Sequence, residues 1–93
     1  NVFFACGKSI ITRAQMPNVS RVASFLKNNP NATVSVKGYA SPEGPAALNQ
    51  TLSEKRAKAV ADYLKGRGVV VDEAVGKGVQ GNTSNRLAVV YVK

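Results

Sequence analysis

Apolar residues recur along this 93-residue chain with two different periods, and these periods predict its secondary structure. Apolar residues three or four positions apart predict a helix over Pro17–Asn28, where Pro17 suits the first turn. The same spacing predicts a longer helix from about Pro45 to Lys65, which ends at the Gly-Arg-Gly sequence that follows. Alternation of apolar and polar residues predicts a strand over Thr33–Lys37.

Short apolar runs predict three more strands, over Asn1–Ala5, Val69–Val75 and Arg86–Lys93. The glycine-containing stretches 38–44 and 76–85 predict loops between these elements. The resulting order, β-α-β-α-β-β, predicts a sandwich of the α+β or α/β class, with a four-stranded mixed sheet and two helices on one sheet face. Residues 1–93 suit a single domain, and the start on a strand leads us to expect that it is part of a longer protein.

The longer predicted helix carries a charged residue on the side that its apolar residues define. We take Leu52 as the centre of the apolar stripe, and about 100° per residue then places Arg56 about 40° away. Leu48, Ala59 and Tyr63 lie within the same 40° of Leu52. A guanidinium on this side needs partners, because an unpaired buried charge costs several kcal/mol.

Two interpretations of Arg56 are open. In the first, its stem covers the edge of the core while the guanidinium reaches water or pairs with Glu43. In the second, a ligand carboxylate completes it, since a carboxylate accepts two parallel hydrogen bonds from a guanidinium. The loop 38–44 precedes this helix at a strand end, where ligands of α/β sheets tend to bind, and Asn49 lies two helical turns before Arg56. These residues therefore form a candidate anion pocket.

Charge and composition narrow the function classes. Thirteen Lys and Arg residues against five Asp and Glu give a net charge of +8 at pH 7, which favours anionic partners. The chain contains no His, which excludes most acid–base catalytic mechanisms and most metal sites. The carboxylates are scattered along the sequence, and Cys6 is interpreted as a small packed residue. The stretch Gly76–Gly81 matches G-x-G-x-x-G, but a strand follows it, so these glycines are expected to shape a connection between strands. We expect neither an enzyme nor a cofactor or metal site.

RNA binding is a distant alternative for a basic α/β domain of this size. That mode uses exposed aromatic residues on a sheet face. Phe3 and Phe4 are expected in the core of a strand, and Phe25 and Tyr63 in the core of a helix, which leaves Tyr91. We therefore expect no nucleic acid as partner. No stretch approaches the roughly 18 apolar residues of a membrane span, and we expect membrane contact only through the rest of the parent protein.

The stretch from Pro30 to Val69 resembles the C-terminal domain of outer membrane protein A and its relatives, the OmpA-like peptidoglycan-binding domain. That family has a strand ending G-H-T-D, a further glycine, and then N-x-x-L-S-x-x-R-A-x-x-V-x-x-x-L. The matching residues here are Gly38, Gly44, Asn49, Leu52, Ser53, Arg56, Ala57, Val60 and Leu64. Phe3–Ser9 is similar to the family's F-F-D-x-N-K-S opening, and Asn85-Arg86 to the start of its N-R-R-V close.

The resemblance implies a βαβαββ fold and non-covalent binding of the peptidoglycan stem peptide. It implies that Arg56 holds the carboxylate of diaminopimelate, with Asn49, the main chain near Leu52, and Arg86 supporting this half of the site. The family aspartate that takes the ligand's ammonium is replaced here by Ser41, so we expect Glu43, two residues on, to meet the ammonium together with Ser41. This Ser-Pro-Glu-Gly loop resembles members from Bacteroides-type bacteria.

The resemblance therefore predicts a domain on the periplasmic side of the outer membrane of a Gram-negative cell, which anchors that membrane to the cell wall without catalysis. The main alternative is a degenerate OmpA-like domain, in which Glu43 pairs with Arg56 and the domain has only a structural or protein-interaction role. A homodimer is left open.

Overall fold

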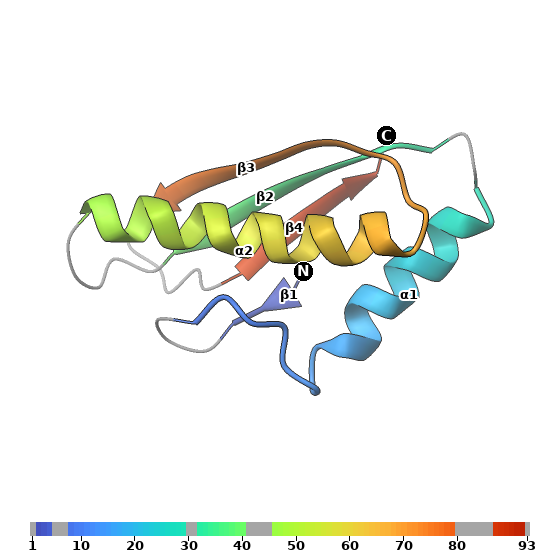
Figure 1. Ribbon diagram of the computed structural model, residues 1–93, viewed down its shortest axis with the longest axis horizontal. Coiled ribbons are helices and arrows are strands. Elements are labelled where there is room, and N and C mark those ends of the chain that lie inside the picture. Colours follow the sequence, from blue (N-terminus) through green and yellow to red (C-terminus); the bar gives the residue numbers. More distant parts are fainter. Residues whose placement is uncertain (1, 5–7, 30–31, 41–45, 80–86, 93) are drawn as a thin grey trace.

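The computed structural model describes residues 2–4, 8–29, 32–40, 46–79 and 87–92. Its elements are β1 (Val2–Phe3), α1 (Met16–Lys27), β2 (Val34–Ala40), α2 (Ala46–Gly66), β3 (Val71–Val79) and β4 (Leu87–Val92). The strands form one sheet in the order β1-β4-β2-β3, in which β2 and β3 are parallel and the other neighbours are antiparallel. Figure 1 shows α2 lying across this sheet, with α1 beside its C-terminal half. The predicted element order and the mixed sheet are confirmed.

The core lies between the sheet and the two helices, because one stripe of each helix and one face of each strand are apolar. Helix α1 contributes its buried side chains at i, i+4 and i+7, and each central strand contributes alternate residues. The buried apolar side chains of this cluster are Val2, Phe4, Val19, Ala23, Leu26, Val34, Val36, Ala57, Val60, Ala61, Leu64, Val69 and Ala88. Both helices therefore pack on the same sheet face. No helix in the described ranges is long and apolar enough to cross a membrane.

The sequence placed the ends of two strands wrongly. Strand β2 continues through Gly38 to Ala40, and β3 continues through Gly76 to Val79, where loops were expected. Both extensions are held in the sheet, since Gly38 is paired with Gly76 on one side and with Ala88 on the other. Glycine has a low intrinsic preference for strands, so tertiary pairing decides these positions.

The glycines of β2 and β3 are there because α2 crosses the sheet at very close range. A Cβ added to Gly38 would overlap the main-chain oxygen of Ser53, and one added to Gly76 would lie 2.5 Å from the Glu54 nitrogen. Gly78 adopts a φ of +63°, a conformation that favours glycine. The G-x-G-x-x-G match is therefore part of a helix–sheet contact up to Gly78, Val79 ends β3, and Gln80 and Gly81 lie outside the described ranges.

A second correction concerns which side of α2 is buried. Leu48, predicted near the centre of the apolar stripe, is 65% exposed, and Leu52 is only partly buried. The buried side chains of α2 are Asn49, Ser53, Arg56, Ala57, Val60, Ala61 and Leu64. This face is centred about 100° further round the helix, on Ser53. Small residues, Ser53 and Ala57, occupy it opposite Gly38 and Gly76, because the main chains of helix and sheet approach too closely there for larger side chains.

Two aromatic residues are also exposed against expectation. Phe3 and Phe25 are 51% and 55% exposed, whereas Phe4 is buried and Tyr63 packs against the edge of the core. Phe3 alternates with the buried Val2 and Phe4, so it points to the sheet face that carries no helix. Phe25 lies on the outward side of α1.

Candidate binding site

Arg56 is the centre of the candidate site, and it is entirely buried. Its Nε donates a hydrogen bond to the main-chain oxygen of Lys8 at 2.9 Å, and its Nη1 donates one to the main-chain oxygen of Tyr39 at 3.0 Å. The centre of its guanidinium lies 5.4 Å from the centroid of the Phe4 ring. The expected inward placement of Arg56 is therefore confirmed.

These contacts explain how a full positive charge is accommodated in so small a core. Two carbonyl dipoles point their negative ends at the guanidinium, and the face of an aromatic ring attracts a cation. Hydrogen bonds that involve a charged group are stronger than neutral ones, particularly where water is excluded. Arg56 thus ties α2 both to the end of β2 and to the segment that follows β1.

The remaining predicted residues divide into two groups. Asn49 is buried on the same face of α2 as Arg56, two turns nearer the N-terminus of the helix, and Leu52 lies between them, partly exposed. Ser41, Glu43 and Arg86 lie outside the described residues, as does Cys6. The half of the site on α2 is therefore located, and the expected contacts of Ser41 and Glu43 with an ammonium stay predictions.

Position in the fold links Arg56 to the loop that was expected to bind the ligand. Tyr39, whose carbonyl accepts from Arg56, stands two residues before Ser41. Lys8, whose carbonyl accepts from Nε, directly follows residues 5–7. The guanidinium therefore lies beside the carboxyl end of β2, which is the position that open sheets use for ligands.

Sequence reasoning missed three partners of Arg56. The carbonyl groups of Lys8 and Tyr39 belong to the main chain, so no side-chain pattern signals them. Phe4 was expected in the core, but not as the ring beneath the cation. The match of Phe3–Ser9 to the family's opening was the one available signal that this segment belongs near the site.

The Tyr39 side chain has a separate environment. Burial, and then a side-chain hydrogen bond with Tyr91 and the charge interaction between the two phenols, raises the pKa of Tyr39 above its ordinary value of 10.0. The hydroxyl of Tyr39 therefore stays protonated at physiological pH. Lys37 Nζ lies 5.0 Å from the centroid of the Tyr91 ring, so the sheet face that carries no helix holds a small cluster of aromatic and basic residues.

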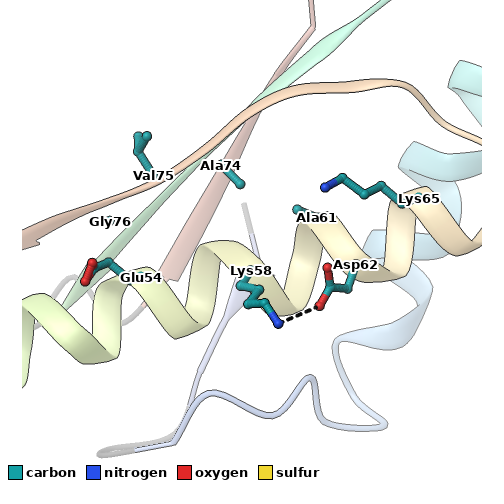
Figure 2. A pocket seen from close by; sticks show the side chains of 8 residues that line it. All are labelled: Glu54, Lys58, Ala61, Asp62, Lys65, Ala74, Val75 and Gly76. Atoms are coloured by element: carbon teal, nitrogen blue, oxygen red, sulfur yellow. Dashed lines mark ion pairs between the residues drawn. The ribbon is translucent and has the colours of Figure 1, made fainter.

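A pocket lies in the groove between α2 and β3 (Figure 2). It has a volume of about 520 Å³, with Glu54, Lys58, Asp62 and Lys65 along its α2 wall. Lys58 and Asp62 form an exposed ion pair at 3.5 Å. Positive and negative side chains are balanced here, so this groove does not favour an anion. No cluster of three metal-binding side chains occurs within the described ranges.

Comparison with known proteins settles the relationship of the chain. The sequence model of the OmpA family matches residues 3–88. The chain belongs to the OmpA family. Outer membrane protein 41 of Porphyromonas gingivalis is 34% identical over 100 residues, which span 99% of this chain and 25% of that relative. The peptidoglycan-binding protein ArfA of Mycobacterium tuberculosis is 42% identical over 73 residues, which span 78% of this chain and 22% of that relative.

The crystal structure of the peptidoglycan-associated lipoprotein from Burkholderia pseudomallei superimposes on this OmpA-family chain with a TM-score of 0.85. The two are 21% identical, and the match covers 99% of this chain and 88% of the other. At that identity the likeness establishes the fold alone. The chain spans about a quarter or less of the length of the two curated relatives. The resemblance inferred from the sequence motifs is confirmed, and so is the fold class.

Proposed function

We propose that this domain binds peptidoglycan non-covalently, through the stem peptide, and thereby anchors an outer membrane to the cell wall without catalysing a reaction. The observation that carries the proposal is the buried Arg56 at the carboxyl end of β2, in a chain of the OmpA family. The names of two relatives, a peptidoglycan-binding protein and a peptidoglycan-associated lipoprotein, support the choice of ligand. The net charge of +8 favours an anionic polymer.

In this proposal, Arg56 holds the carboxylate of the diaminopimelate side chain. A guanidinium has five N–H donors in a planar fork, and two bonds to main-chain oxygens fix its orientation. Asn49 and the main chain near Leu52 orient the carboxylate, and Arg86 adds positive charge. Ser41 and Glu43 meet the ammonium group of the same ligand. Because the guanidinium has no exposed surface, binding requires that groups now covering it give way.

The family also supports a place in the cell envelope, since the relative in Porphyromonas gingivalis is named an outer membrane protein. We propose the periplasmic side of the outer membrane, where peptidoglycan lies, and a parent protein longer than this single domain. The family relationship favours this envelope role over the RNA-binding alternative.

A second candidate function is a purely structural OmpA-like domain. The observation in its favour is the same burial of Arg56, since the hydrogen bonds to Lys8 and Tyr39 give the guanidinium a role without any ligand. In that case Arg56 links two segments of the fold, and the domain packs against other proteins rather than binding the wall.

Calorimetric titration with two matched ligands separates these functions. Free meso-diaminopimelate differs from L-lysine by one carboxylate, the group assigned to Arg56. We expect the wild type to prefer diaminopimelate over lysine by about 10- to 100-fold, the range expected for hydrogen bonds to a charged group. Arg56→Lys should lose this preference, and Glu43→Gln should weaken both ligands alike because it acts on the shared ammonium. Circular dichroism checks that each variant is folded.

Each outcome decides between the candidates. Equal affinity of the wild type for the two ligands, or no heat at millimolar concentrations of either, leaves Arg56 with the structural role only. Loss of the preference in a folded Arg56→Lys variant supports the carboxylate assignment. If Glu43→Gln binds as the wild type does, Ser41 or the main chain carries the ammonium instead.

A further inference from the structure

The acidic residues of this chain are confined to part of the sequence, so its net charge is unevenly distributed. The first 42 residues contain Lys8, Arg13, Arg21, Lys27 and Lys37 and no Asp or Glu. The acidic residues in the described ranges, Glu54, Asp62, Asp72 and Glu73, belong to α2 and β3. In Figure 1, β3 lies along one side of the molecule, and the segment before α1, with α1 itself, lies along the other. The α1 side therefore attracts anions more strongly than the average charge implies.

A pocket of about 600 Å³ opens on this side, where the start of α1 meets the end of α2. It is lined by Arg13, Met16, Pro17, Ser20, Tyr63 and Arg67. Two guanidinium groups thus face one hollow whose other walls are an aromatic ring, a thioether and a proline. No carboxylate from the described part of the chain lines it.

Arg67 is held in place by the Tyr63 side chain. Arg67 Nη2 donates a hydrogen bond to the Tyr63 hydroxyl at 2.9 Å, and its guanidinium lies 5.1 Å from the centroid of that ring. Arg67 is therefore oriented before any ligand arrives. Among the described residues, neither Arg13 nor Arg67 lies within 4.0 Å of a carboxylate, and the neighbouring Asp62 is paired with Lys58. The pocket thus presents two positive charges that the described part of the fold does not neutralise.

Two large apolar side chains of α1 are also exposed, Met16 in the lining of the pocket and Phe25 about two turns further along the helix. Met16 and Phe25 are 38% and 55% exposed, although each is large enough to belong in a core. The outward side of α1 carries a ridge of three exposed residues spaced four apart, Pro17, Arg21 and Phe25. The arginine of this ridge lies between its two apolar residues. Basic side chains attract anionic headgroups, and an exposed aromatic side chain beside them can enter the boundary between headgroups and acyl chains.

From this geometry we propose that the α1 side of the domain binds the surface of an anionic phospholipid membrane, with one headgroup phosphate in the pocket between Arg13 and Arg67. Guanidinium groups bind phosphate bidentately, and the apolar ridge enters the boundary between headgroups and acyl chains. This goes beyond peptidoglycan binding and uses other residues, since the pocket lies two to three helical turns along α2 from Arg56.

Co-sedimentation with vesicles tests the proposal. The probes are vesicles of phosphatidylcholine alone and vesicles with 30% phosphatidylglycerol, a composition chosen for the assay. The variant Arg13→Gln/Arg67→Gln removes the phosphate ligands, and Lys55→Gln/Lys65→Gln removes two charges from elsewhere on α2. Both doubles change the net charge from +8 to +6, that is 8 − 2, so only position distinguishes them. Phe25→Ser tests the apolar ridge.

We expect the wild type to bind the anionic vesicles and not the neutral ones. Loss of both arginines should weaken partitioning by about 30-fold, the factor expected for two basic residues at an anionic surface. The lysine double should weaken it by less than about 3-fold, because Lys65 lines the groove on the β3 side of α2 and Lys55 lies about two helical turns before Tyr63, so neither belongs to the pocket. Phe25→Ser should weaken it by about 10-fold, and the loss should persist in high salt because it is hydrophobic.

Other results would overturn the proposal. Equal losses in the two double variants would mean that only net charge matters. Vesicle binding unaffected by Phe25→Ser and abolished by salt would mean a contact by charge alone, which any polyanion could make, and would overturn the insertion of apolar side chains. Saturable binding of inorganic phosphate that displaces the domain from vesicles would assign the pocket to free phosphate. Retention of both doubles on purified sacculi is expected, and its failure would bear on peptidoglycan binding rather than on this proposal.

Discussion

Replacing Gly38 with alanine probes the contact that sets the position of α2. A Cβ at Gly38 would overlap the main-chain oxygen of Ser53 and would lie 2.8 Å from the main-chain nitrogen of Ala57 and 3.0 Å from the carbonyl carbon of Ser53. All three atoms belong to the main chain of α2, so no side chain can rotate away. The helix must move from the sheet as a whole, or β2 must bend.

The magnitude follows from the kind of atoms involved. Adding one methyl group to a well-packed interior costs about 1–3 kcal/mol when side chains can adjust, and more when they cannot. We therefore expect Gly38→Ala to lower the free energy of unfolding by about 3 kcal/mol or more. For a domain of this size that corresponds to a fall in Tm of roughly 12–24 °C. The displacement also lengthens the bond from Arg56 to Tyr39, since Tyr39 adjoins Gly38.

Gly66 provides the matched control. It is the last residue of α2, and a Cβ added there would have nothing within 4 Å. Gly66→Ala should leave the free energy of unfolding unchanged or raise it by up to about 1 kcal/mol, because alanine has the higher helix preference. Urea unfolding followed by circular dichroism measures both variants. A Gly38→Ala domain within about 0.5 kcal/mol of the wild type would refute the close-approach reasoning.

Three further predictions concern individual contacts. Ser53→Ala removes the hydroxyl that accepts a buried 2.9 Å hydrogen bond from the Gly78 N–H, so the free energy of unfolding should fall by about 1–3 kcal/mol in urea titrations. The Gly78 amide should also exchange faster with solvent. Thr51→Ala is the control, because it loses only an exposed hydrogen bond and should change the free energy of unfolding little. Because the folded-state pKa of Tyr39 is raised, its contribution to the free energy of unfolding is complete below about pH 10 and is lost as the pH rises through the folded pKa. Tyr39→Phe should therefore lose less stability between pH 9 and 11.5 than the wild type, as measured by urea unfolding at each pH. An unchanged pH profile would contradict the assignment. Lys58→Ala breaks an exposed i,i+4 ion pair and should alter the unfolding free energy by no more than about 0.5 kcal/mol in urea titrations, and salt should reduce this difference further by screening the pair.

The sequence determined the order of the elements and the family. Helix α1 has its apolar residues at helical spacing, and Val34 and Val36 alternate with polar residues in β2, so local pattern and final fold agree there. The block from Asn49 to Leu64 carries the family motif. Helical spacing around Leu52 predicted that Arg56 points inward, although a charge there contradicts the usual preference of cores.

The buried face of α2 and the lengths of β2 and β3 depend on tertiary packing. The apolar stripe through Leu48 and Leu52 is centred about 100° from the buried face of α2. The orientation of the helix follows its close contact with the glycines of β2 and β3 and not its own hydrophobicity. The partners of Arg56 were likewise beyond the sequence, since carbonyl oxygens occur at every residue and only the fold selects two of them. Strand pairing and close main-chain contact join segments that are far apart in the sequence. A local pattern of side chains therefore does not predict them.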